Sequence, residues 1–112
     1  MTQKIPSFIS DINNEMIDAA VHALENEKFI LGESVFKFEE EFAKYIGTKN
    51  AISVNSGSSA LHLSLLSVNI SNNSKVITST NSFIASSNTI LSTGAEPILV
   101  DVDESDGNLD MK

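Results

Sequence analysis

The sequence contains no cysteine, no arginine and no tryptophan among its 112 residues. The absence of cysteine excludes thiol catalysis, disulfide bonds and cysteine metal sites. The absence of arginine leaves seven lysines against fifteen acidic residues, and the formal net charge is −8. Because binding to a nucleic-acid backbone needs clustered cations, a nucleic-acid partner is not expected. An anion site in this chain must therefore rely on backbone N–H groups, hydroxyl groups and lysine.

The chain also lacks long apolar segments. No apolar run is long enough to span a bilayer, so a membrane partner is not expected. The N-terminal residues lack the continuous apolar stretch of a secretory signal peptide. We expect a cytoplasmic globular protein, and the hydrophobic content of 41% and charged content of 20% are typical of that class.

The spacing of the apolar residues predicts seven elements. Helical spacing alternates with short apolar runs rich in β-branched residues. Ser34 is placed to cap the second helix and Gly47 to end it. The order α-α-β-α-β-α-β predicts an α/β fold with right-handed crossovers and a mostly parallel sheet. The predicted helices cover residues 12–24, 35–46, 58–68 and 82–93, and the predicted strands cover residues 51–54, 75–78 and 98–102.

The last part of the sequence does not resemble the end of a finished α/β domain. A polar turn over residues 103–107 follows the third predicted strand, and another helix is expected to begin after it. Three strands with exposed edges make a poor finished sheet. We therefore expect that the sequence covers only the first part of a longer fold.

The stretch of residues 55–63, which we call the cup, is the strongest candidate for a binding site. Its small residues Ser56, Gly57, Ser58 and Ser59 connect a predicted strand to a predicted helix. Free N–H groups and the helix dipole favour a phosphate at such a helix N-terminus, and Gly57 permits close approach of the backbone. The alternative is an ordinary turn in which Ser56 or Ser58 only caps the helix. The spacing matches neither the Walker A loop nor the dinucleotide-binding glycine motif.

Phe83 is the second candidate. It follows the predicted strand at residues 75–78, and parallel strands bring their carboxyl ends to the same edge of a sheet. An aromatic side chain at that edge could stack on a planar ring whose phosphate the cup holds. The alternative is that Phe83 is a core residue near the start of a helix.

Two further groups of polar residues give weaker signals. The acidic residues from Asp101 to Asp106 resemble a calcium loop, but Asp106 and Lys112 stand where that pattern needs glycine and glutamate. A solvated strand end is the expectation there, and no metal site is assigned. His22 and His62 have no obvious carboxylate or nucleophile partner in the sequence, so surface or packed roles are expected.

Four sequence blocks resemble those of the DegT/DnrJ/EryC1/StrS aminotransferases, in the same order and at the same spacing. One block alone is weak, whereas four together are specific, and they cover nearly the whole chain. Members of this family are fold-type-I enzymes that depend on pyridoxal 5′-phosphate and act on nucleotide-linked keto-sugars. The blocks are a glycine turn with its following acidic helix, at residues 29–32 and 38–43, and residues 56–63, 82–88 and 94–103.

The resemblance implies a role for each candidate residue. Ser58 and Ser59 would hold the cofactor phosphate, Gly57 would shape the turn, and Phe83 would stack on the pyridine ring. The family usually has threonine in place of Ser58 and alanine in place of Ser59. The first departure keeps a hydroxyl group, and the second adds one. His62 keeps a structural role.

The resemblance also implies an incomplete enzyme. Residues 1–48 would form an N-terminal helical segment, and residues 49–112 the truncated start of the cofactor-binding α/β large domain. The family's aspartate for the pyridine nitrogen and its cofactor-binding lysine match no position here, so no catalytic residue is assigned and the chain itself is expected to be inactive. The lysines outside that motif are Lys4, Lys28, Lys37, Lys44, Lys49, Lys75 and Lys112.

The whole enzyme implied by the resemblance would move an amino group from an amino-acid donor, glutamate, to a nucleotide-linked keto-sugar, and would be a homodimer. Three alternatives stay open. A family relative could use histidine in place of the lysine and dehydrate the sugar. The chain could be a non-catalytic piece of a split protein. It could also be a generic phosphate-binding α/β domain.

Overall fold

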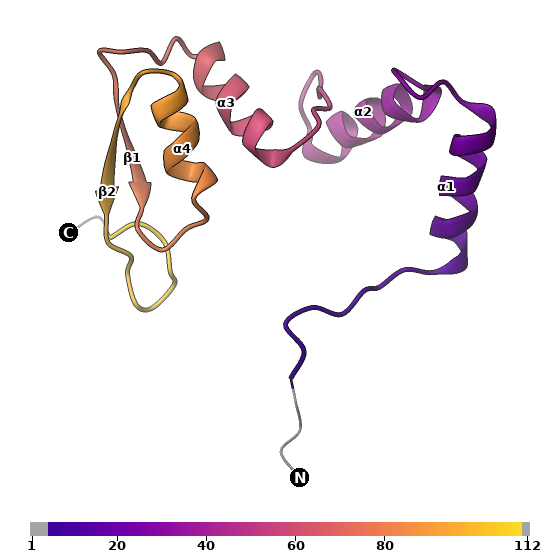
Figure 1. Ribbon diagram of the computed structural model, residues 1–112, viewed down its shortest axis with the longest axis horizontal. Coiled ribbons are helices and arrows are strands. Elements are labelled where there is room, and N and C mark those ends of the chain that lie inside the picture. Colours follow the sequence, from indigo (N-terminus) through magenta and orange to yellow (C-terminus); the bar gives the residue numbers. More distant parts are fainter. Residues whose placement is uncertain (1–4, 111–112) are drawn as a thin grey trace. The chain divides into compact units, whose positions relative to one another are not determined.

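The computed structural model describes residues 5–110, and these fold as two compact units, one up to Ser53 and one from Val54 onward (Figure 1). No helix within residues 5–110 combines the length and the apolar character needed to cross a membrane. The elements of the first unit are helices α1 (Asn14–Asn26) and α2 (Glu33–Ile46). Those of the second are helix α3 (Gly57–Ser67), strand β1 (Lys75–Ser79), helix α4 (Ala85–Ser92) and strand β2 (Glu96–Val100).

Side-chain caps define how the two helices of the first unit begin. The Asn13 side chain accepts a hydrogen bond from the Met16 N–H at 2.9 Å, which starts α1. The prediction that Ser34 caps α2 is wrong, because Gly32 is the N-cap residue and Ser34 lies inside the first turn. Its N–H donates to the Glu27 carboxylate at 2.9 Å, and its hydroxyl group donates to the same carboxylate. The Glu27 carboxylate, at the end of α1, thus accepts a backbone N–H group in the first turn of α2.

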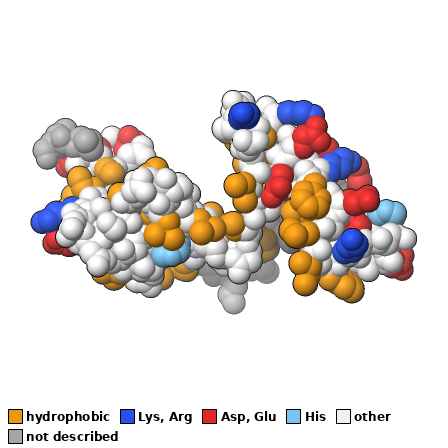
Figure 2. All heavy atoms as spheres, turned by 90° about the horizontal axis from the view of Figure 1, so that it is seen from above, with side chains coloured by type: hydrophobic (Ala, Val, Ile, Leu, Met, Phe, Trp, Pro, Cys, Tyr) orange, Lys and Arg blue, Asp and Glu red, His pale blue; other side chains and the backbone are white. Residues whose placement is uncertain are grey.

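Helix α2 is amphipathic and keeps much of its aromatic face exposed. The rings of Phe38 and Phe42 stack with their centroids 5.5 Å apart, and the Tyr45 ring follows 6.5 Å from that of Phe42. An ion pair between Lys44 and Glu40, 2.7 Å long, lies on the charged side of the helix. Phe38 is 57% exposed and Tyr45 84% exposed, and Figure 2 shows such apolar side chains at the molecular surface.

The second unit confirms the predicted α/β fold with a parallel sheet. Strands β1 and β2 pair in parallel, from Lys75 opposite Glu96 to Ser79 opposite Val100. Helix α4 makes the crossover between them and packs against both strands, and α3 packs against α4. The buried Ile90 of α4 belongs to the small apolar core of this unit. The sheet therefore positions the turn after β1, where Phe83 lies.

The first predicted strand, residues 51–54, is not a strand among the described residues. The sheet there has only β1 and β2, and the observed order is α-α-α-β-α-β. A strand exists only as part of a hydrogen-bonded ladder, and sequence composition does not supply the neighbour. The Ser53 N–H instead donates to the Glu39 carboxylate at 2.6 Å.

The last predicted strand is shifted toward the N-terminus. It covers Glu96–Val100 instead of residues 98–102, and Val102 forms an isolated antiparallel bridge with Leu109. The helix that is expected to begin after the polar turn of residues 103–107 falls outside the described residues, which end at Asp110. A polar turn connects the two bridge residues, with the Asp103 N–H donating to the Asn108 carbonyl at 2.9 Å.

Gly94 generates a first testable prediction. It has φ +82°, and an alanine Cβ there would come 1.7 Å from the Asn72 Oδ1 atom. Gly94→Ala should lower the free energy of unfolding by about 2 kcal/mol or more, because both the backbone conformation and the space disfavour a side chain. Gly107→Ala is the control, since Gly107 has φ +73° and open space. Chemical denaturation should show that Gly107→Ala lowers the free energy of unfolding by about 1 kcal/mol. An equal loss of stability in the two variants would contradict the contact with Asn72.

The contact between Glu27 and Ser34 generates a second prediction. Hydrogen bonds from the Ser34 hydroxyl and N–H lower the pKa of Glu27. A lowered pKa in the folded state stabilises the fold above the unfolded pKa, and this is lost as the pH falls through the folded pKa. The protection factor of the Ser34 amide, which is its intrinsic exchange rate divided by the observed rate, should therefore fall in acid, whereas Glu27→Gln should remove that fall in protection. Glu25→Gln removes the same charge from α1 and should behave as wild type. Equal acid profiles for Glu27→Gln and wild type would refute the interpretation.

Candidate functional site

The cup is organised by the N-cap of helix α3. Ser56 is the N-cap residue, with extended backbone, and its Oγ accepts a hydrogen bond from the Ser59 N–H at 3.1 Å. The Ser56 carbonyl accepts the Ala60 N–H at 3.0 Å. This leaves two N–H groups of the first turn, those of Gly57 and Ser58, without a hydrogen-bond partner among residues 5–110. The first turn of α3 contains no acidic residue, so the positive end of the helix dipole is open to an anion.

The hydroxyl groups of the cup form a chain that leaves one of them free. Ser56 Oγ donates to Ser59 Oγ at 3.0 Å, and Ser59 Oγ donates to Asn55 Oδ1 at 2.7 Å. The Ser58 hydroxyl takes no part in this chain and has no partner in the described part of the sequence. The ordinary-turn alternative is thus correct for Ser56, which caps the helix, while the donors of Gly57 and Ser58 remain available for a ligand.

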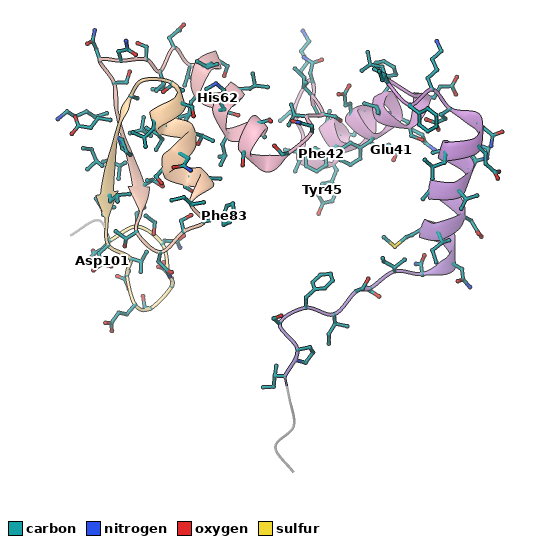
Figure 3. All side chains as sticks on the ribbon, in the orientation of Figure 1. Glu41, Phe42, Tyr45, His62, Phe83 and Asp101 are labelled. Carbon is teal, nitrogen blue, oxygen red and sulfur yellow. The ribbon has the colours of Figure 1, made fainter. Side chains whose placement is uncertain are left out.

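A hollow of about 530 Å³ lies beside the cup. His62 belongs to α3 and lies toward α4 (Figure 3), and its Nδ1 atom is buried without a hydrogen-bond partner within the described residues. This agrees with the expectation of a packed histidine. The hollow is lined by Val54, Asn55, Ser58, Ser59, His62, Leu63, Thr89 and Ser92.

Phe83 lies in the turn between β1 and α4. The predicted helix at residues 82–93 begins later, at Ala85, so Phe83 precedes it. The side chain points outward (Figure 3) and is 76% exposed, so it is not packed into the core of the second unit as described. Phe83 lines a second hollow of about 210 Å³ whose other walls are mostly hydroxyl-bearing side chains: Ser79, Thr80, Ser82, Ile84, Ser86, Ser87 and Leu99.

The predicted site residues fall into two groups. Ser58 and Ser59 line the larger hollow and Phe83 the smaller one, while Gly57 lines neither of these two, so one hollow does not contain all of them. Asn55 is a residue of the cup that the sequence did not single out as a candidate site residue. Its carboxamide accepts the Ser59 hydroxyl and lines the same hollow as Ser58. Only the side-chain geometry shows this, because asparagine before a small-residue turn is common.

The acidic residues after β2 shape a turn. Asp103 Oδ1 accepts the Ser105 N–H at 2.9 Å, and Asp106 Oδ1 accepts the Asn108 N–H at 2.9 Å. The bond from the Asn108 backbone is the main cause that lowers the pKa of Asp106. Within residues 5–110, no three or more His, Asp or Glu side chains are grouped so that they could hold a metal ion. The acidic segment therefore has a structural use.

The sequence profile of the DegT/DnrJ/EryC1/StrS aminotransferase family matches residues 10–112. The chain belongs to this family. Among the curated relatives, the GDP-perosamine synthase of Caulobacter vibrioides is 42% identical over 80 residues. That match covers 71% of this chain and 22% of the synthase.

Solved structures agree with this assignment. The sugar aminotransferase Spr1654 of Streptococcus pneumoniae in its pyridoxal-phosphate form superimposes with a TM-score of 0.86 at 26% identity, over 96% of this chain and 28% of that one. A GDP-4-keto-6-deoxymannose-3-dehydratase gives a TM-score of 0.84 at 26% identity, over 96% of this chain and 29% of that one. The chain thus spans less than a third of the length of the relatives it matches.

Proposed function

We propose that this chain is the N-terminal, cofactor-phosphate-binding part of a pyridoxal-phosphate-dependent sugar aminotransferase. The observation that carries the proposal is the open N-terminus of α3, where Gly57 and Ser58 present free N–H groups. Membership in the aminotransferase family supports the choice of cofactor. The substrates would be a nucleotide-linked keto-sugar and an amino-acid donor, glutamate.

The residues of the cup fit a phosphate group. Gly57, Ser58 and Ser59 would form the cofactor-binding turn, with neutral donors at the positive end of a helix dipole. Phe83 would stack on the pyridine ring, because its exposed ring follows the carboxyl end of β1. When bound, pyridoxal 5′-phosphate supplies the electron sink for amino transfer. The part of this chain is to hold the phosphate and orient the ring.

We assign no catalytic residue to the chain. Lys4 and Lys112 lie outside the described residues, and the cup and its hollow contain no lysine. In this proposal, as the resemblance implies, the residue that attaches the cofactor covalently matches no position of this sequence. In the same proposal, residues 1–48 form the N-terminal helical segment and residues 49–112 begin the large domain.

The whole enzyme would be a cytoplasmic homodimer. The family of biosynthetic aminotransferases supports a small-molecule role. The exposed aromatic face of α2, formed by Phe38, Phe42 and Tyr45, is consistent with further contacts to other protein surfaces.

A second candidate is the dehydratase branch of the same family. The similarity to GDP-4-keto-6-deoxymannose-3-dehydratase favours it, because the matched region is the same and the TM-score is nearly as high. Such an enzyme would share the cup and differ in the residue that works on the cofactor. A third candidate is a non-catalytic domain that binds phosphate. It would need only the cup.

Binding of a cofactor analogue tests the cup. Pyridoxine 5′-phosphate has no aldehyde and cannot react with lysine, so titration calorimetry reports the non-covalent site. We expect it to bind more tightly than pyridoxine. Ser58→Ala should weaken binding about tenfold or more, since a hydrogen bond to a charged group contributes about 1.5–3 kcal/mol. Phe83→Leu should weaken binding of both compounds about threefold or more, because stacking adds about 0.5–1.5 kcal/mol.

Two matched variants control this titration. Ser64→Ala removes a hydroxyl from α3 outside the cup, and Phe8→Leu removes an exposed ring from the other unit. Both should bind as wild type does. Equal affinity of the wild-type chain for pyridoxine and its phosphate ester would overturn the proposed function.

The absence of an assigned lysine gives a separate prediction. Incubation with pyridoxal 5′-phosphate followed by borohydride should label several lysines weakly, because no described lysine lines the hollow beside the cup. Peptide mapping by mass spectrometry measures the distribution. Stoichiometric labelling of one lysine would show that the chain contains a cofactor-binding lysine and would refute this assignment.

A further inference from the structure

The orientation of the Asn55 side chain is fixed by the hydroxyl chain of the cup. Ser56 Oγ accepts the Ser59 N–H, so it directs its own proton to Ser59 Oγ. Ser59 Oγ then directs its proton to Asn55 Oδ1, at 2.7 Å. Because a hydroxyl group has one proton to donate, the direction runs from Ser56 through Ser59 to Asn55. The carbonyl oxygen of the Asn55 carboxamide is therefore the atom that accepts the Ser59 hydroxyl group.

The nitrogen end of the same carboxamide is free. A carboxamide NH₂ group carries two donors, and Asn55 Nδ2 has no hydrogen-bond partner among residues 5–110. Asn55 also lines the same hollow as Ser58, whose hydroxyl has no partner among the described residues either. Two side chains with unused donors thus border one space next to the free N–H groups of α3.

The charge pattern makes neutral donors necessary at this place. The hollow is lined by no lysine, and the chain has no arginine. Besides the imidazole of His62, the donors available to an anion bound here are backbone N–H groups, hydroxyl groups and a carboxamide. Without the hydrogen bond from Ser59, the Asn55 carboxamide could turn its Oδ1 atom toward the anion. That oxygen is an acceptor with partial negative charge, so it would repel the anion.

We propose that Asn55 is a further phosphate-binding residue of the cup and that Ser59 is its positioning residue. Asn55 donates through Nδ2 to the phosphate of the ligand, while the Ser59 hydroxyl holds Oδ1 away from it. This inference rests on the proposed function, because it assigns donors to the same phosphate. It divides the roles within the cup, with Ser58 as a direct ligand and Ser59 acting through Asn55.

Asn55→Asp is the sharpest test. The aspartate keeps the shape and the oxygen that accepts the Ser59 hydroxyl, but it replaces the NH₂ donors with a negatively charged oxygen. The fold should tolerate this change, because an acidic group near a helix N-terminus stabilises the helix. We expect thermal stability to be kept and the affinity for pyridoxine 5′-phosphate to fall at least tenfold, with pyridoxine binding unchanged.

Ser59 is tested by removal and rescue. Ser59→Ala should weaken binding of pyridoxine 5′-phosphate about threefold to tenfold, and Ser59→Thr, which restores a hydroxyl, should return it to within about twofold of wild type. In the ligand-free chain, NMR of the Asn55 side-chain NH₂ should show altered shifts in Ser59→Ala and near-native shifts in Ser59→Thr. Ser64→Ala is the matched control and should change neither measurement.

The outcomes separate this inference from the proposed function. If wild type prefers the phosphate ester but Asn55→Asp binds it equally well, the role of Asn55 is refuted and the proposed function stands. If the NH₂ signals of Asn55 are unchanged in Ser59→Ala, the positioning role of Ser59 is refuted without reference to any ligand. If wild type does not distinguish the ester from pyridoxine, the proposed function fails and the phosphate role of Asn55 fails with it.

Discussion

The N–H groups that a helix cannot satisfy within itself are the constraint on which the candidate site depends. Helix α3 begins at Gly57, and the Ser56 side chain and carbonyl satisfy the third and fourth of its N–H groups. The first two, of Gly57 and Ser58, have no partner in the described part of the chain, and the first turn contains no acidic residue. The cup is therefore a consequence of incomplete capping, in which one serine stabilises the helix and the next, Ser58, is left for a ligand.

Local sequence pattern predicted most of the fold. The four helices and the parallel pairing of β1 with β2 follow from apolar spacing and from strands that alternate with helices. The errors concern partners distant in the sequence. Residues 51–54 have strand composition but no ladder among the described residues. Gly32 and not Ser34 is the N-cap of α2, and Ser34 donates to Glu27, seven residues earlier. Neither partner can be deduced from the residues themselves.

The candidate site was predicted less completely. The small residues of the cup and Phe83 could be recognised because they lie where strands end and helices begin. The resemblance in four blocks gave the family, to which the chain belongs. The direction of the hydroxyl chain could not be predicted, since it depends on which oxygen accepts from which proton. Asn55 could therefore be recognised as a candidate only from the structure, in which hydrogen bonds of 2.7 and 3.0 Å connect it through Ser59 to Ser56.

The close contact of Gly94 with Asn72 has a consequence for how this sheet can change its sequence. The contact lies at the starts of the strands, where the Glu96 N–H also donates to the Ser74 carbonyl and Lys75 pairs with Glu96. These interactions fix the register of β1 against β2 from one edge. At the opposite end of the strands the pairing continues through backbone atoms, with the Thr80 N–H donating to the Val100 carbonyl at 2.9 Å. Because these bonds do not involve side chains, the side chains of the turn that contains Phe83 can change without a slip of the strands.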